Sequence, residues 1–568
     1  MSIVDRLAAA RGDTKAHLVL RNARLVNVIS GEIYPTDIVI HDRHVVALGA
    51  GYEGRREVDL TGKFVTPGLI DAHVHIESSL VTPAEFARAV LPHGVTTVIT
   101  DPHEIANVLG LEGMRFMLER AKHGPLNMFV MASSCVPATD METSGARLEA
   151  EDLAQLVDHA WVLGLAELMN YPGVALGDEG MLDKIALFEG LALDGHAPNM
   201  TGAMLNAYVA AGVQSEHECT TIEEAREKLR LGLAIFIREG TTTRNLKPLL
   251  PLVTEANHGA ICFCTDDRIP ADLIDHGSID HMIRIAIAAG VDPLLAIRMG
   301  SSNTARHFGL KKYGAVAPGR YADLVVVDDL RDFTPEQVYR GGALVAENGK
   351  MVAAAGSARG IDLRGTVNLS PTALDFTLPA QSPRIRVIGA ITDQVITDHL
   401  VEDAKIIKGC AVSDVERDIL KFAMVERHRA SGDLGLAFIK GFGLKRGAIA
   451  GTVAHDHHNL AVIGADDFSM NTAVKAIAEM GGGLVAVNGN EILAALPLPI
   501  AGLLSDRPIE EVRSRYDRMI EAAHGLGNRM SDPFMVMSFM GLEVIPGLKL
   551  TDQGLVDVER FKLVCPFV

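Results

Sequence analysis

The strongest constraint on the fold is a series of eight short apolar segments that recur along the first half of the chain. They alternate with segments that have the pattern of helices or loops. Short apolar runs without alternation are typical of strands buried on both faces, as in a parallel sheet. The eight runs lie at 68–75, 95–100, 126–133, 162–166, 191–194, 212–215, 233–237 and 260–264. Eight such units in succession predict an α/β fold, a (β/α)₈ TIM-type barrel over residues 66–310.

The segments on either side of this region have a different pattern. Between His17 and Leu48, short β-like runs are separated by turn residues, and a similar run, Ala322–Asp328, follows the barrel. We therefore expect one flanking β-sandwich domain made from residues 1–65 and 311–365, with the barrel inserted between its halves. Residues 366–568 contain both β-like and helix-like segments, and we expect a C-terminal α+β domain there.

Composition and charge exclude several classes of protein. A chain of 568 residues, 48% of them hydrophobic, can bury more than one domain core. The net charge of −19, without a block of Lys or Arg, argues against a nucleic-acid partner. The sequence has no long uncharged apolar run, so we expect no membrane span. Six cysteines without a Cys-x-x-Cys pair, and an N-terminus without the pattern of a secretory signal, favour a cytoplasmic location.

Side chains of metal-binding types stand at the ends of most of the predicted strands. The first strand ends in His73-Val74-His75, and the period of two places both histidines on one side of the strand. An isolated pair of this kind is more often a surface feature than a ligand pair. Here further candidates follow the later strands, namely Asp101, His103, Glu104, Glu167, His196, His217, Glu218, Arg238, Glu239, Asp266 and Asp267. Because strand ends of a barrel converge, these residues predict a divalent-metal site with mixed histidine and carboxylate ligands.

These motifs resemble those of the amidohydrolase superfamily, in which a metal-dependent barrel is flanked by a β-sandwich from both termini. The ligand order of the superfamily is matched strand by strand by His73, His75, Glu167, His196, His217 and Asp266. Many members carry a carboxylated lysine on the fourth strand, where this chain has Glu167. Over nearly the whole chain, four longer strings are similar to the bacterial adenine deaminase family: 73–79, 101–108, 194–198 and 215–218.

The resemblance implies hydrolytic deamination of adenine to hypoxanthine and ammonia at a binuclear centre, in purine salvage. We expect one ion to be held by His73, His75 and Asp266, the other by His196 and His217, and both to be bridged by Glu167. The expected ions are Mn²⁺ or Fe²⁺, with Zn²⁺ as the alternative. A metal-bridging hydroxide would attack C6, and Asp266 would carry its proton to the leaving ammonia. We also expect a homodimer.

Protonation of the purine ring requires a second acid. Barrel deaminases with one metal often have a glutamate three residues after the fifth-strand histidine, but this chain has Asn199 there. The candidates are Glu77, Glu104, Glu218 and Asp267. Glu77 and Glu104 follow the first two strands closely enough to be expected as catalytic. Helix capping or ion pairing is the alternative role for each. The side chains expected to contact substrate are His103, Asp267, Glu218, Arg238 and His457, and an additional metal ion is the alternative ligand of His103.

Some questions stay open at the level of sequence. The cluster His455–Asn459 in the C-terminal region could bind a metal, close over the barrel mouth or be an ordinary polar loop. The alternatives for function are a deaminase or amide hydrolase acting on another heterocycle, and a metal-free barrel that serves as a scaffold. The scaffold hypothesis expects at least one ligand position to be replaced, whereas all six hold competent ligands.

Overall fold

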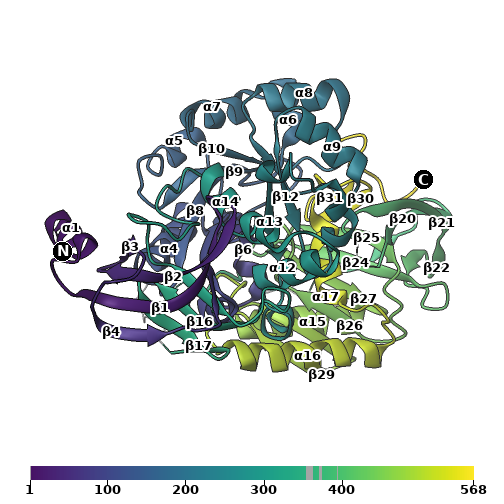
Figure 1. Cartoon of the computed structure of the whole chain (residues 1–568). Coiled ribbons are helices and arrows are strands. Elements are labelled where there is room, and N and C mark those ends of the chain that lie inside the picture. Colours follow the sequence, from purple (N-terminus) through teal and green to yellow (C-terminus); the bar gives the residue numbers. More distant parts are fainter. Residues whose placement is uncertain (1, 353–362, 370–373, 393) are drawn as a thin grey trace.

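The computed structural model describes residues 2–352, 363–369, 374–392 and 394–568 (Figure 1). The N-terminal strands, purple in Figure 1, lie to one side of the barrel, and the green and yellow C-terminal segments lie to the other. Residues 353–362, just before the predicted boundary at 366, are outside the described residues. The predicted domain limits therefore stay predictions.

Eight parallel strands form the barrel. They are β6 (Leu69–His75), β7 (Val95–Thr100), β8 (Asn127–Ser133), β9 (Val162–Leu168), β10 (Ala192–Gly195), β11 (Ser215–Glu216), β12 (Ala234–Arg238) and β13 (Ile261–Cys264). Strands β6 to β10 pair in order, and so do β11 to β13. The N–H of Gln214 donates to the carbonyl of Leu193 at 2.9 Å and links the two groups. The short strand β14 (Asp266–Asp267) pairs with β6 and closes the barrel. The predicted fold class is confirmed.

Both faces of these strands are buried, which explains their unbroken apolar runs. In β8, Met131 points into a core inside the barrel with Ile70 and Phe236, whereas Val130 packs in the core outside it. The outer layer consists of α2 (Pro83–Val90), α3 (His103–Leu109), α4 (Leu111–His123), α5 (Ala150–Leu153), α6 (Tyr171–Leu176), α7 (Glu179–Leu187), α8 (Gly202–Ala210), α9 (Ile222–Arg230), α10 (Leu246–Leu249), α11 (Pro270–Asp275), α12 (Ile279–Ala288), α13 (Pro293–Met299) and α14 (Ser302–His307). Several begin at a side-chain cap, as α7 does at Asp178.

One nine-stranded sheet contains strands from both flanks of the barrel. After α1 (Ile3–Arg11), its strands are β1 (Ala16–Asn27), β2 (Glu32–His41), β3 (His44–Leu48), β4 (Gly54–Asp59), β5 (Phe64–Pro67), β15 (Leu324–Val327), β16 (Pro335–Arg340), β17 (Ala343–Glu347) and β18 (Lys350–Met351). The antiparallel pairing of β5 with β15 joins the two halves. The strands share a core of their own that includes Leu20, Leu25 and Val326.

The C-terminal region is built on an eight-stranded sheet. Its strands, in spatial order, are β21 (Thr397–Asp403), β20 (Arg384–Ala390), β25 (Leu434–Lys440), β24 (Ile419–Val425), β27 (Leu460–Gly464), β26 (Ala448–Gly451), β28 (Gly483–Asn488) and β29 (Glu491–Pro497). Smaller sheets are formed by β19 (Leu378–Pro379), β23 (Cys410–Val412) and β22 (Lys405–Ile407), and by β30 (Leu548–Thr551), β31 (Gly554–Asp557) and β32 (Lys562–Val564).

Alternation within β24 shows how the large sheet is covered. Ala423 and Val425 pack in the core under helix α15 (Asp467–Met480). Phe422 and Met424 point the other way, into the core shared with α16 (Ile509–Leu526), α17 (Pro533–Ser538) and the outside of the barrel. The loop 452–459 between β26 and β27 is buried as well. The C-terminal sheet therefore packs on the barrel with a continuous apolar interface.

Among the described residues, no helix has the length and apolar character that a membrane crossing requires.

Candidate metal centre

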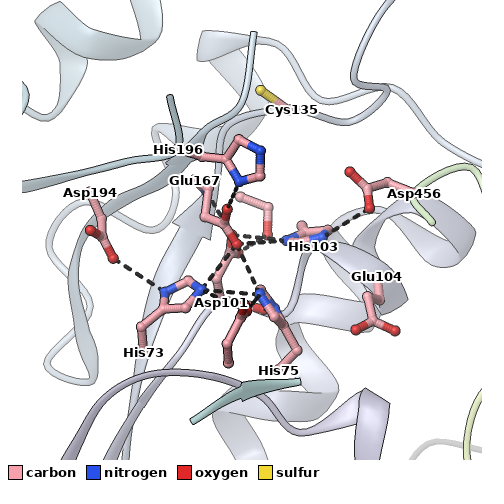
Figure 2. A network of polar contacts seen from close by, with 12 residues as sticks. His73, His75, Asp101, His103, Glu104, Cys135, Glu167, Asp194, His196 and Asp456 are labelled. Carbon is pink, nitrogen blue, oxygen red and sulfur yellow. Dashed lines mark hydrogen bonds and ion pairs between the residues drawn. The ribbon is translucent and has the colours of Figure 1, made fainter. Parts of the chain in front are cut away.

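Glu167, at the end of β9, lies between His196 on one side and His73 and His75 on the other (Figure 2). Its Oε1 is 2.9 Å from Nε2 of His75 and 3.1 Å from Nε2 of His73. Its Oε2 is 2.7 Å from Nδ1 of His196 and 3.3 Å from Nε2 of His217. All five side chains are buried. Each carboxylate oxygen thus faces its own pair of imidazole nitrogens.

Asp266, on β14, adds a carboxylate to the first pair. Its Oδ1 is 3.2 Å from Nε2 of His75 and 3.8 Å from that of His73. The backbone of Asp266 has φ 57°, a left-handed conformation that costs a non-glycine residue free energy and is concentrated at functional sites. The six residues predicted as ligands therefore lie together at the carboxyl ends of the strands. Imidazole nitrogens and carboxylate oxygens, without a thiolate, fit first-row divalent ions.

Two of the histidines are oriented by groups behind them. Oδ2 of Asp194 lies 3.3 Å from Nδ1 of His73, and the carbonyl oxygen of Asp101 lies 3.0 Å from Nδ1 of His75. Partners of this kind fix the ring orientation of a metal-binding histidine and leave its other nitrogen for the metal. The sequence analysis gave these two aspartates no such role. A signal was present, because an aspartate precedes a histidine by two residues at 71, 101 and 194.

The carboxylates dominate the electrostatics of the cluster. Burial alone lowers the pKa of His73, but Glu167 and Asp194 outweigh it and raise that pKa to about 10. In the same way, Glu218 and Glu167 outweigh burial at His196 and raise its pKa to about 9. The buried carboxylates thus stabilise positive charge among these rings, either as protons or as metal ions.

Arg238, 3% exposed at the end of β12, holds two of these carboxylates. Its Nη1 lies 2.9 Å from Oδ2 of Asp266, and its guanidinium forms a two-pronged contact with Glu218, where Nη2 is 2.7 Å from Oε2. Glu218 in turn is 3.5 Å from both His196 and His217. The predicted residues Arg238 and Glu218 therefore belong to the centre.

His103 connects the centre to the C-terminal region. Its Nδ1 lies 3.0 Å from Oδ2 of Asp101, which also accepts the N–H of Glu167 at 2.6 Å. Its Nε2 lies 3.3 Å from Oδ1 of Asp456, in the loop between β26 and β27. Figure 2 displays this connection, with Asp456 on the far side of His103 from Glu167.

Glu77 and Glu104 lie beside the centre and do not line its cavity. Glu77 accepts the N–H of Ile105 at 3.3 Å, and Glu104 accepts the hydroxyl of Ser78 at 3.0 Å. Ser78 also contacts Asp267, which does line the cavity. Burial raises the pKa of Glu77 to about 7, and burial together with Glu77 and Asp267 raises the pKa of Glu104. Glu104 is thus separated from the cavity by one hydroxyl group.

His457 does not line the cavity either, since its Nδ1 accepts the N–H of Asn459 at 3.0 Å and its ring packs at Gly541. From the same cluster, His455 and Asp456 reach the cavity instead. The predicted contact of His457 with substrate stays a prediction, and in this conformation its two neighbours are nearer to the centre.

Two adjoining cavities lead to the centre. The inner one, of about 30 Å³, is closed by Phe539, Leu542 and Ile545 of the C-terminal region and has room for water. The outer one, of about 680 Å³, lies between Thr241–Asn245 and the C-terminal region. The two share Glu218, Arg238, Thr243, Val395 and Ile545. Arg238 therefore stands where the outer cavity meets the inner one.

Comparisons with known proteins agree with this arrangement. Residues 64–345 match the amidohydrolase family, and residues 394–562 match the adenine deaminase C-terminal domain. A protein of Desulfatibacillum aliphaticivorans named adenine deaminase is 50% identical over 563 residues, which cover 99% of each chain. This chain belongs to the adenine deaminase family.

Other relatives in the adenine deaminase family are similarly close. The adenine deaminase of Methanothrix thermoacetophila is 48% identical over 567 residues, again 99% of each chain. Among solved structures, N-acetyl-D-glucosamine-6-phosphate deacetylase from Mycobacterium smegmatis is 21% identical, with a TM-score of 0.44 over 58% of this chain and 100% of that one. Membership in the amidohydrolase family implies use of a divalent metal, and the buried histidine and carboxylate groups fit one.

Proposed function

We propose that the protein hydrolyses adenine to hypoxanthine and ammonia. The observation that carries the proposal is the position of Glu167, whose two oxygens each face a histidine pair at the mouth of a barrel covered by the family's C-terminal domain. Similarity to adenine deaminases over the full chain supports adenine as the substrate.

The metal ligands we propose are those of the sequence analysis. His73, His75 and Asp266 would hold one divalent ion, His196 and His217 would hold the other, and Glu167 would serve both. The donor groups His73–His75–Asp266 and His196–His217–Glu218, each within 4.8 Å, support two separate positions. When bound, such ions supply a water whose pKa is lowered from about 16 toward about 7. Mn²⁺ or Fe²⁺ is the expected metal, with Zn²⁺ as the alternative.

Asp266 is the proton carrier in this proposal. In the overall reaction a C6–O bond forms, the C6–N6 bond breaks and the amino group leaves as ammonia. Asp266 takes the proton of the attacking water and returns it to the leaving nitrogen. Its Oδ2 is oriented by Arg238 at 2.9 Å, which fixes the carboxylate beside the histidines.

We assign protonation of the ring nitrogen to Asp267. Of the four candidate acids, only Glu218 and Asp267 line the cavity, and Glu218 is engaged by the fork of Arg238. The hydroxyl of Ser78 links Asp267 to Glu104. Because the pKa of Glu104 is raised, this side chain can hold a proton and supply it to Asp267 through Ser78. Glu104 therefore acts behind Asp267 and not on the substrate, and Glu77 supports this group through its position beside Glu104.

The apolar side chains Phe539, Leu542 and Ile545 cover the inner cavity and exclude bulk water from the reacting groups. A place in purine salvage, a cytoplasmic location and a homodimer remain predictions, and light scattering would check the last of these.

The direct experiment measures ammonia release from adenine, guanine and cytosine by protein reconstituted with Mn²⁺, Fe²⁺ or Zn²⁺, with metal content measured in parallel. We expect release from adenine at two metals per chain. If two metals were bound and ammonia were released only from another base, the proposed metal centre would stand and adenine would be rejected as the substrate. Trace metal and no release from any base would favour the scaffold alternative.

A further inference from the structure

Both ring nitrogens of His103 face carboxylates. Nδ1 is 3.0 Å from Asp101 and Nε2 is 3.3 Å from Asp456. The ring of His103 is therefore fixed between the two carboxylates. Its structural effect is to hold the Asp456 carboxylate in one orientation.

Asp456 has a second oxygen that is not used in this contact. The side chain is 1% exposed and lines the inner cavity. Oδ1 faces His103, whereas Oδ2 has no hydrogen-bond partner among the described residues. A buried carboxylate oxygen without a donor costs free energy, and in a native site the donor comes from ordered water, an ion or a ligand. Because this oxygen belongs to a residue that lines the cavity, a ligand can supply it.

The position of Asp456 relative to Glu167 limits which donor it can meet. The ring of His103 stands between them, with Nδ1 3.9 Å from Oε1 of Glu167 and Nε2 on the side of Asp456. For the proposed reaction, C6 and its amino group must lie beside Glu167. The remaining N–H of adenine belongs to the five-membered ring, at the other end of the base.

We propose that Oδ2 of Asp456 accepts a hydrogen bond from the N–H of the five-membered ring of adenine. The inference rests on the proposed function and adds a substrate-contacting residue from the C-terminal domain. It also assigns a source of specificity, because a base substituted on that nitrogen, as in a nucleoside, has no proton to donate and leaves the buried carboxylate unpaired.

The test uses the full-length, metal-loaded protein and the variant Asp456→Asn. In this variant the amide oxygen would accept the hydrogen bond of His103, so the amide NH₂ would face the N–H of the substrate. Two donors would then face each other, and no hydrogen bond to the substrate would form. We expect kcat/KM for adenine to fall about 10- to 100-fold, mainly through KM, as for loss of a hydrogen bond to a charged group. The inhibition constant of hypoxanthine should rise by a similar factor. Asp552→Asn is the matched control, since Asp552 contacts Asn459 of the same loop and does not line the cavity.

Substrates substituted on the ring nitrogen separate recognition from a structural effect. The wild-type enzyme should prefer adenine to 9-methyladenine, and Asp456→Asn should reduce that preference. Equal losses on both substrates, or unchanged kinetics, would overturn the role of Asp456. Equal turnover of both substrates by the wild type would do so without any variant, even if Asp456→Asn failed to fold. If the wild-type protein did not turn over adenine at all, the proposed function itself would be wrong.

Discussion

Oδ2 of Asp194 lies 3.3 Å from Nδ1 of His73, on the edge of the ring opposite the nitrogen that faces Glu167. Asp194→Asn should therefore loosen the orientation of His73 and lower metal affinity about 10- to 100-fold. The affinity is measured as the amount of metal retained per chain after dialysis against increasing concentrations of a chelator. Asp183→Asn, at an exposed position on α7, is the control. Equal metal retention by the two variants would show that Asp194 does not support the centre.

Glu167→Gln should weaken both metal positions together. The amide offers one neutral acceptor oxygen where two charged ones face the histidine pairs, so each ion loses a ligand charge. Metal analysis of the purified variant should give well under two equivalents per chain, and ammonia release should fall with it. Glu223→Gln, on the exposed face of α9, should retain both. Two equivalents in Glu167→Gln would refute the bridging role.

Arg238→Met should destabilise the fold as well as the centre. It leaves Glu218 and Asp266 buried without the guanidinium that separates their charges. Removing one partner of a buried ion pair costs about 3–5 kcal/mol. Denaturant unfolding of the metal-loaded proteins measures the loss. Arg238→Lys should recover only part of it, because an ammonium cannot form the two-pronged contact. Stability of Arg238→Met within about 0.5 kcal/mol of wild type would contradict this.

Lys549 predicts a rise in stability with pH. Its Nζ donates to the carbonyls of Val395 and Phe539, and burial lowers its pKa to about 7. An unfolded lysine titrates near pH 10.4. Between these values the unfolded state binds the extra proton, so the free energy of unfolding rises with pH by up to about 1.4 kcal/mol per unit.

The variant Lys549→Met should lack this contribution. Thermal midpoints of wild type and variant are compared at about pH 7 and about pH 9, and the wild-type midpoint should rise relative to that of the variant at the higher pH. Effects of pH on metal binding are common to both proteins and cancel in the comparison. Lys475→Met, at an exposed position on α15, should follow the wild type. A difference between Lys549→Met and wild type that does not change with pH would show that Lys549 is charged in the fold.

The barrel could be predicted from sequence because its strands are buried on both faces. The run 95–100 coincides with β7, and 126–133 begins one residue before β8. The prediction of the sixth strand at 212–215 was less accurate, because β11 has only two residues, Ser215 and Glu216, and both are polar. A strand held by neighbours on both sides does not need an apolar run of its own.

The positions of the predicted metal ligands could be inferred from sequence because they follow the barrel strands. The positions of the residues around those ligands could not be inferred in this way. The chain turns after β6 into a 3₁₀ helix, Glu77–Ser79, that ends at Leu80 with φ 59°, and this turn takes Glu77 away from the cavity. The contact of His103 with Asp456 joins two domains far apart in sequence. A contact of this kind leaves no periodic pattern in the sequence, so the sequence identified the cluster 455–459 but not which of its residues reaches the cavity.

The wall of the inner cavity comes from two stretches of chain that fold in separate domains. A substitution confined to the barrel leaves Asp456, Phe539, Leu542 and Ile545 unchanged on the opposite wall. In the proposed function, a change of substrate therefore depends on residues of both the barrel and the C-terminal region. Recombination that exchanged C-terminal domains between members of the family would also exchange this wall of the cavity.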